Sequence, residues 1–296
     1  MKPKIYGSII TKNSEAWLEA VLTTMSWMPK IFLVDNGSTD QTLSIAKKFK
    51  NVDIQKVQID LPHSVAHQRN LSAAQVPDDA WIYFADSDEL ITQDLRQEIL
   101  AAIQNSNDTA YMIPRLNVQL GHPLYHGGWY PDHQLRLIKK SALVEWVNGP
   151  LNLPPFINED KFANLRKATY GPHDKPLLKK DTSVWYLKYP YIHFNHQSLD
   201  SMLQKTPRFL NSEALYLKDA GLLSRPSYLT FLAAPAKDFL IRFILKRGFR
   251  DGTVGLIESI YMAFSAFLFE VKKWELTQKP LPEVYAKLKE KYVKDA

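Results

Sequence analysis

Short apolar runs alternate with amphipathic segments over the first ninety residues, and this alternation limits the fold more than any other feature. The apolar runs cover residues 5–10, 31–34, 52–57 and 81–84, with helical patterns at 14–26, 40–49 and 64–74 between them. Short strands separated by helical segments are typical of βαβ units with a parallel sheet buried on both faces. The sequence therefore predicts an α/β fold whose ligands bind beyond the carboxyl ends of the strands.

The rest of the chain has a different character. Residues 111–190 are rich in Pro, Gly, His and Trp and show no clear period, so we expect strands and long loops that complete the same domain. Helical patterns then follow at 198–217, 227–246, 253–273 and 281–293. We therefore expect one α/β domain over residues 1–190 and a helical C-terminal region over residues 191–296.

Composition excludes several classes of protein. The 296 residues include no Cys, which rules out a thiolate nucleophile, a disulfide framework and a Cys-ligated metal. The net charge of +6 favours an anionic partner, but Lys and Arg are scattered, so no nucleic-acid partner is expected. The glycine-rich phosphate loops of dehydrogenases and ATPases are absent, and the His spacings do not suggest zinc.

Nothing in the sequence predicts a leader or a membrane span. The N-terminal apolar run at 5–10 is too short for a signal-peptide core, and the most apolar stretch, 254–271, carries Glu258 and Glu270. We therefore expect a cytoplasmic chain.

Polar clusters follow three of the predicted strands and should meet at one edge of the sheet. They begin at Thr11, Asp35 and Asp86. Asp86 and Asp88 are two residues apart, so both carboxylates face one way if the strand continues. Together they can hold Mg²⁺ or Mn²⁺ with a substrate diphosphate, because these ions prefer oxygen ligands. The alternative is an acidic turn that caps the next helix.

Asp35 and Arg69 are also open to two interpretations. The Asn-Gly pair after Asp35 predicts a turn that caps a helix, yet a carboxylate directly after a buried strand can also accept hydrogen bonds from a base or ribose. Arg69 is either a solvated helical residue or a phosphate contact.

Four motifs in order give the chain a resemblance to a known family. IITKN at 9–13, VDNGSTDQT at 34–42, QRN at 68–70 and FADSDE at 84–89 resemble the family 2 glycosyltransferases, which have the GT-A nucleotide-sugar-binding fold. The resemblance implies a UDP-sugar donor and a divalent cation, Mg²⁺ or Mn²⁺. The residues it implies for the donor are Thr11, Asn13, Glu15, Asp35, Arg69 and Asp86, and those it implies for the metal are Asp88 and Asp86.

Further motifs narrow this resemblance. GWYPD at 128–132, IHFN at 192–195 and GFRDG at 248–252 are similar to segments of glycosyltransferases that build the lipopolysaccharide core. The resemblance implies inverting transfer of a hexose to a cell-envelope glycan or glycolipid. Residues 149–180 depart from the subgroup pattern, which leaves the acceptor open. The alternatives are a polyprenyl-phosphate glycosyltransferase and a non-catalytic protein that binds nucleotide-sugar or carbohydrate.

Inverting transfer needs a general base that removes a proton from the acceptor hydroxyl. The adjacent carboxylates Glu159 and Asp160 are followed by Leu-Arg and a later Gly, as in many family 2 enzymes, and we favour Asp160. Asp132 and Glu145 are the alternatives. The sequence around Glu159 also fits a helix start.

An apolar stripe within the C-terminal region carries a last expectation. Phe239, Leu240, Phe243 and Ile244 form this stripe, and five Lys and Arg residues flank it, which is typical of a helix lying in a membrane interface. The open alternatives are peripheral attachment to the inner face of the cytoplasmic membrane and packing of the stripe against the α/β domain.

Overall fold

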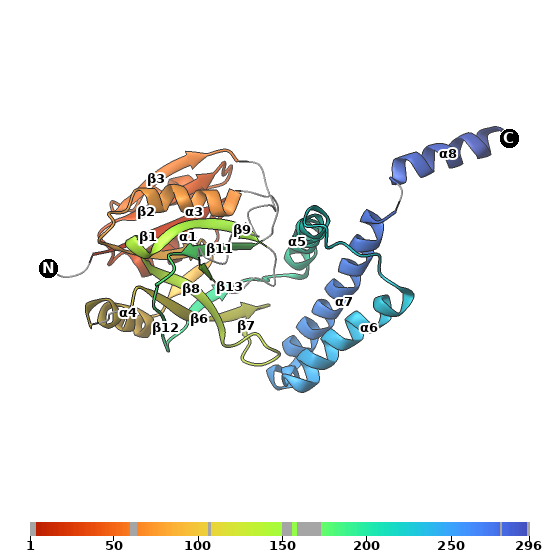
Figure 1. Cartoon of the computed structure of the whole chain (residues 1–296). Coiled ribbons are helices and arrows are strands. Elements are labelled where there is room, and N and C mark those ends of the chain that lie inside the picture. The colour runs from red at the N-terminus through yellow and green to blue at the C-terminus, as the bar shows by residue number, and fades with distance from the viewer. Residues whose placement is uncertain are drawn as a thin grey trace.

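A computed structural model describes residues 4–59, 64–105, 108–149, 156–158, 173–278 and 280–294 (Figure 1). A ten-stranded mixed sheet forms the N-terminal body, and a layer of helices extends from one side of it (Figure 1). The predicted α/β class, with a mostly parallel sheet and a helical C-terminal region, is confirmed.

The predicted βαβ units form one half of the sheet. Its strands are β1 (Ile5–Thr11), β2 (Ile31–Asn36), β3 (Val52–Val57) and β4 (Trp81–Asp86), with helices α1 (Leu18–Met25), α2 (Thr42–Ala46) and α3 (Ser64–Ala74). The strands run parallel in the order β3-β2-β1-β4. Thr11 pairs with Asp35, and Ile10 pairs with Asp86, so the three polar clusters meet at one sheet edge.

The second half of the sheet mixes strand directions. It contains β5 (Glu89–Ile91), β6 (Ala110–Gln119), β7 (His122–Pro123), β8 (Asp132–Lys139), β12 (Val184–Tyr186) and β13 (Tyr191–Phe194), with helix α4 (Gln93–Asn105) before β6. β8 lies antiparallel between β4 and β6, whereas β13 runs parallel to β6. This arrangement brings His193 of β13 beside Glu89 of β5, close to the end of β4.

A separate small sheet was not expected. A 3₁₀ turn (Lys140–Ala142) leads into β9 (Leu143–Gly149), which pairs with β11 (His173–Leu178), and β10 (Ile157–Asn158) pairs with β11 in turn. These strands pair with one another instead of extending the main sheet. Trp146 of β9 and Leu178 of β11 are buried in the core with Phe84 of β4, so the small sheet covers one face of the main sheet.

Two apolar cores lie on opposite faces of the main sheet. One contains Leu22 of α1 and Leu95 of α4, and the other contains Ala66 of α3 and Trp146 of β9. All six residues of β2 are buried, as expected of a strand covered on both faces. The apolar runs in the sequence therefore correspond to the central strands.

Helices follow β13, as the sequence predicted. They are α5 (Leu199–Asp219), α6 (Tyr228–Phe239), a π-helical turn η3 (Leu240–Leu245), a 3₁₀ turn η4 (Gly248–Asp251), α7 (Gly252–Leu276) and α8 (Leu281–Lys294). Ser198 caps α5 by accepting a hydrogen bond from the Ser201 amide at 3.2 Å. In the described part of the chain, one helical stretch, Gly248–Leu276, has the length and the apolar composition needed to cross a membrane.

Candidate active site

The β1–α1 segment holds the β2–α2 loop in place. The Asn13 amide donates to Ser38 Oγ at 2.8 Å, and Asn13 Oδ1 accepts from the Thr39 amide at 2.8 Å. Glu15 Oε2 accepts from the Gln41 amide at 2.9 Å. The side chains of Asn13 and Glu15, both predicted to contact the nucleotide, thus position the loop.

Thr11 and Asp35 lie at the base of this edge. Asp35 is buried and accepts a hydrogen bond from the Ser38 amide at 3.0 Å, so it also fixes the turn that includes Gly37 at φ 71°. Thr11 Oγ1 is buried and has no hydrogen-bond partner in the described part of the chain. A buried hydroxyl without a partner costs free energy, so Thr11 fits a site that a ligand completes.

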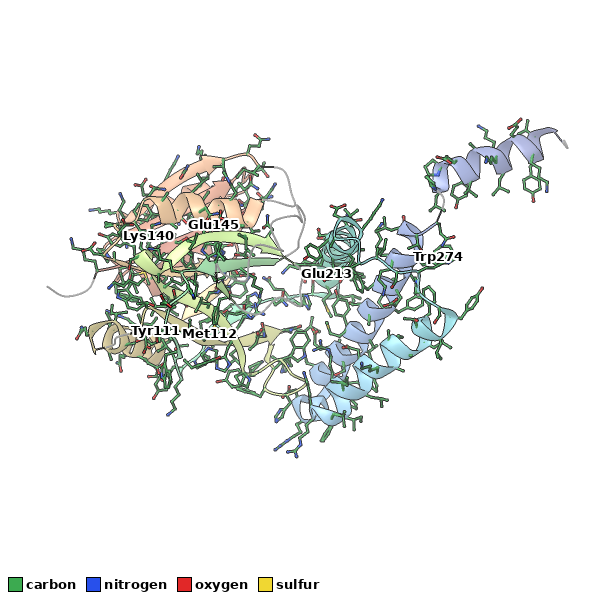
Figure 2. The ribbon with its side chains drawn as sticks, viewed as in Figure 1. Tyr111, Met112, Lys140, Glu145, Glu213 and Trp274 are labelled. Carbon is green, nitrogen blue, oxygen red and sulfur yellow. The ribbon has the colours of Figure 1, made fainter. Side chains whose placement is uncertain are left out.

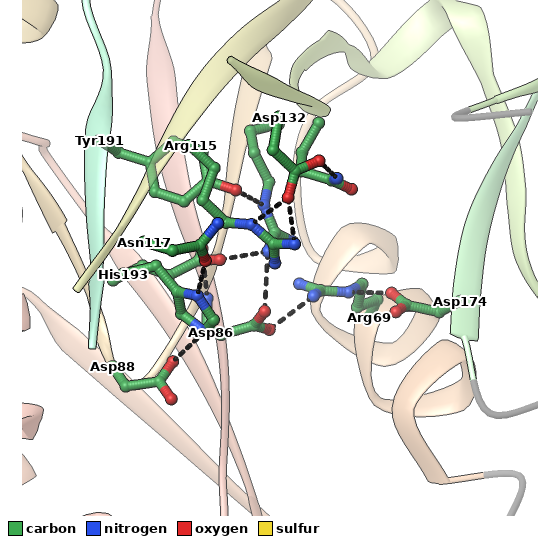
Figure 3. Close-up of polar contacts among 12 residues, drawn as sticks. Arg69, Asp86, Asp88, Arg115, Asn117, Asp132, Asp174, Tyr191 and His193 are labelled. Carbon is green, nitrogen blue, oxygen red and sulfur yellow. Dashed lines mark hydrogen bonds and ion pairs between the residues drawn. The ribbon is translucent and has the colours of Figure 1, made fainter. Parts of the chain in front are cut away.

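Arg69 and Arg136 hold Asp86 from two sides. Arg69 Nη2 lies 2.6 Å from Asp86 Oδ1, and Arg136 Nη2 lies 2.7 Å from Asp86 Oδ2 (Figure 3). Arg69 also pairs with Asp174, and Arg136 with Glu89. Burial alone would raise the pKa of Asp86, but Arg136 and Arg69 outweigh it and hold that pKa well below its usual range. Asp86 is therefore an ionised and already neutralised carboxylate.

The segment that carries Arg69 is buried and anchored. Arg69 is 1% exposed, and its guanidinium lies 4.8 Å from the ring of Trp146. Asn70 bonds the backbone of Trp146 in both directions, at 2.9 and 2.7 Å. Of the two interpretations of Arg69, the solvated helical residue is excluded.

Asp88 lies in a different environment from Asp86. Among the described residues, no Lys or Arg lies within ion-pair distance of its carboxylate. Burial and then the negative charge of Asp86 raise the pKa of Asp88 to about 6. Asp88 is thus the member of the acidic pair whose charge is left for a cation to neutralise.

His193 faces Asp88 across the end of the sheet. Its Nε2 lies 3.8 Å from Asp88 Oδ1, and its Nδ1 lies 2.7 Å from Asn117 Oδ1 (Figure 3). Asn117 Nδ2 donates to the Trp129 carbonyl at 3.2 Å, which orients the amide so that its oxygen accepts from His193. Burial and then Arg115 lower the pKa of His193 well below its usual value, so Nε2 presents a lone pair toward Asp88.

This pair can serve as a metal site completed by a substrate. The described residues contain no group of three or more metal-binding side chains. Mg²⁺ and Mn²⁺ need no such group, since one or two protein ligands suffice when phosphate oxygens supply the rest. Asp88, which forms no ion pair with a Lys or Arg of the described chain, and the neutral His193 fit such an ion, whereas Asp86 is engaged by two arginines. The sequence motif IHFN contained His193, but its spacing gave no signal of a metal ligand.

The structure describes two of the four candidates for the general base. Glu159 and Asp160 lie outside the described residues. Asp132 accepts from Arg115 Nε at 2.9 Å and from Gln134 Nε2 at 2.7 Å. Partial burial alone would raise the pKa of this half-buried carboxyl, but Arg115 outweighs it and holds that pKa below its usual value. Glu145 lies on β9, on the small sheet (Figure 2). Asp132 is therefore a weakly basic carboxylate fixed by an ion pair.

Comparisons with known proteins find relatives among the glycosyltransferases. The profile of Glycosyl transferase family 2 matches residues 8–148. An uncharacterized glycosyltransferase of Rickettsia typhi, RT0209, is 26% identical over 282 residues, which cover 93% of this chain and 88% of the relative. The lipopolysaccharide core biosynthesis glycosyltransferase LpsC of Rhizobium meliloti is 23% identical over 283 residues, which cover 93% of this chain and 94% of LpsC.

Solved structures give more distant matches. Glucosyl-3-phosphoglycerate synthase of Mycobacterium tuberculosis, in complex with Mn²⁺, UDP and phosphoglyceric acid, matches with a TM-score of 0.42 at 17% identity, covering 76% of this chain and 80% of that one. S. aureus TarS 1–349 matches with a TM-score of 0.41 at 13% identity, covering 92% and 89%.

Proposed function

We propose that this chain, a glycosyltransferase whose residues 8–148 form a family 2 domain, is an inverting, metal-dependent enzyme that transfers a hexose from a UDP-sugar to a cell-envelope glycan or glycolipid. One observation carries the proposal. Asp88, a carboxylate with no Lys or Arg of the described chain within ion-pair distance, faces the neutral imidazole of His193, beside an Asp86 whose charge is already neutralised.

The donor lies along the edge where β1, β2 and β4 end. Thr11 and Asp35 offer a hydroxyl and a carboxylate to the nucleoside. Arg69 and Arg136 hold Asp86 at the end of β4, so the donor diphosphate would meet a carboxylate whose charge is already paired. Asn13 and Glu15 act on the donor indirectly, because their bonds shape the β2–α2 loop.

Asp88 and His193 would hold a Mg²⁺ or Mn²⁺ ion, with donor phosphate oxygens as its other ligands. Such an ion supplies stabilisation of the negative charge that develops on the leaving nucleoside diphosphate. Asn117 fixes the His193 ring with Nε2 toward Asp88. A partner at the second ring nitrogen is the usual means of orienting a metal-binding His.

Asp160 remains the proposed general base, with Glu159 and Asp132 as the other acidic candidates. Asp132 is a weak proton acceptor, because Arg115 stabilises its ionised form. Its fixed position next to Trp129 and Tyr130 suits it to hold an acceptor hydroxyl by hydrogen bonding. The LpsC relative supports a lipopolysaccharide-type acceptor.

The test is a screen of UDP-sugars for thermal stabilisation of the full chain, with and without Mn²⁺. A ligand that binds the folded state raises apparent stability by mass action. We expect one UDP-hexose to stabilise the chain only when Mn²⁺ is present, and Asp88→Asn to abolish that shift. Asp53→Asn, an exposed carboxylate on β3 paired with Lys30, is the matched control and should retain it. A shift that needs no metal, or that Asp88→Asn retains, would contradict the proposal.

A further inference from the structure

Helix α6 and the turn η3 carry an apolar surface that no described part of the chain covers. Neither element contains a buried residue. Tyr228, at the start of α6, is 94% exposed. Large aliphatic side chains that are 48–73% exposed follow it: Leu229, Leu232, Leu240, Ile244 and Leu245.

Helix α7 adds a second stripe beside the first. Its exposed apolar side chains are Leu256, Ile257, Ile260, Phe264, Phe267 and Trp274. α6 packs against α7, with the rings of Phe231 and Phe267 6.1 Å apart. Figure 2 shows Trp274 near the end of α7 that points away from the sheet. We call the exposed apolar side chains of α6, η3 and α7 the hairpin face. Many exposed apolar side chains on two helices that pack together are typical of a binding surface.

The charge of this segment indicates what covers the hairpin face. Residues 225–250 contain six Lys and Arg and one acidic residue, a net charge of +5 in a chain whose total is +6. Lys237, Lys246, Arg247 and Arg250 are exposed, and none is in an ion pair with another described residue. An apolar face bordered by cations fits the interface of a lipid bilayer, where the acyl chains are apolar and the headgroups are anionic.

Buried polar contacts argue against α7 crossing a bilayer. Glu258 is fully buried, and its Oε1 lies 3.6 Å from His196 Nδ1 at the end of the sheet. Asp251, just before α7, lies 2.7 Å from His126 Nδ1 and accepts from the His126 amide at 2.7 Å. The first turns of α7 are thus attached to the α/β domain, so the helix can lie along a membrane but not span it.

The same cations argue against a second copy of this chain as the occupant. A two-fold contact buries the same patch of both subunits, so it would bring together two segments that each carry a net charge of +5. Like charges brought together without counterions oppose association.

We propose that the hairpin face binds the interface of an anionic lipid bilayer and presents the donor site to an acceptor anchored in that bilayer. The presentation of the donor site to the acceptor rests on the proposed function, whereas the binding of the bilayer does not. The turn η3 and the residue after it contact the loop before β8. The Gly127 amide donates to the Lys246 carbonyl at 2.8 Å, and the Arg242 guanidinium lies 5.1 Å from the Trp129 ring. Trp129 in turn accepts from Asn117, which holds His193.

The test is flotation of the full chain with vesicles of phosphatidylcholine alone and of phosphatidylcholine with phosphatidylglycerol, at low and high salt. The apolar variant is Leu232→Glu with Leu245→Glu, because both side chains are over 70% exposed and the fold should tolerate the change. The charge variant is Lys237→Gln with Arg250→Gln. Trp185→Glu, an exposed aromatic on β12, is the matched control.

We expect wild type and Trp185→Glu to float with the anionic vesicles only, and less at high salt. The charge variant should bind roughly fivefold more weakly for each cation removed, and the apolar variant should not float. Mn²⁺-dependent UDP binding, measured on the same preparations, should be equal in all four proteins. Its absence from wild type would refute the proposed function and leave the membrane result standing.

Three results would overturn the membrane proposal. The first is flotation of the apolar variant equal to that of wild type, and the second is no flotation of wild type at low salt. The third is a wild-type dimer in sedimentation that the apolar variant converts to monomer, which would make a second copy the occupant.

Discussion

Replacing Arg136 by Met should show how strongly the buried carboxylates Asp86 and Glu89 depend on this cation. Arg136 is buried and donates to Asp86 and Glu89. Met keeps much of the side-chain volume but leaves both carboxylates without this cation. Removing one partner of a buried ion pair costs about 3–5 kcal/mol, because the remaining charge stays buried. We expect the free energy of unfolding to fall by that amount near neutral pH.

The loss should depend on pH in a defined direction. Burial raises the pKa of Glu89 to about 7, although Arg136 opposes the rise. The folded chain therefore holds a proton on Glu89 at pH values where the unfolded chain has released it, and stability falls as pH rises toward 7. Without Arg136 the pKa of Glu89 should rise further, so the Arg136→Met deficit should be larger at about pH 8 than at about pH 5.

Urea denaturation followed by tryptophan fluorescence measures both effects. Lys47→Met, at an exposed cation just after α2, is the control and should change the free energy of unfolding by less than about 0.5 kcal/mol. Adding Glu89→Gln to Arg136→Met should recover part of the loss at high pH. A loss below about 1 kcal/mol, or one that does not vary with pH, would refute the reasoning.

Three further predictions concern the metal and the base. Asn117→Ala should weaken Mn²⁺-dependent UDP binding about 10–100-fold in calorimetry by freeing the His193 ring, and unchanged affinity would exclude this positioning role. Asp160→Asn should lower transfer about 10²–10⁴-fold with donor affinity retained, whereas Asp132→Asn should be milder; a fully active Asp160→Asn enzyme would move the base elsewhere. Because a proton competes with the cation for Asp88, whose pKa is about 6, metal-dependent UDP affinity should fall as pH drops below 6, and a flat profile would contradict this.

Much of the fold could be predicted because its signals are local. Buried parallel strands such as β2 appear as continuous apolar runs, and their carboxyl ends must meet at one edge. The convergence of Thr11, Asp35 and Asp86 followed from this alone. The small sheet of β9, β10 and β11 could not be predicted, because its strands depend on partners distant in sequence and show no alternation.

The candidate site was predictable only in part for a similar reason. Asp86 and Asp88 differ by two positions, yet one is neutralised by Arg69 and Arg136 and the other faces His193. Those partners come from α3, β8 and β13, and no local pattern relates them. The pairing of His193 with Asn117, 76 residues away, likewise required the sheet order.

The most direct test of the account is calorimetric titration of UDP into wild type and Asp88→Asn, each with and without Mn²⁺. The account predicts that wild type binds UDP much more tightly with Mn²⁺ and that Asp88→Asn binds it equally weakly in both conditions. Asp53→Asn should behave as wild type. Metal-dependent UDP affinity in Asp88→Asn equal to that of wild type would contradict the placement of the metal and donor at the end of β4.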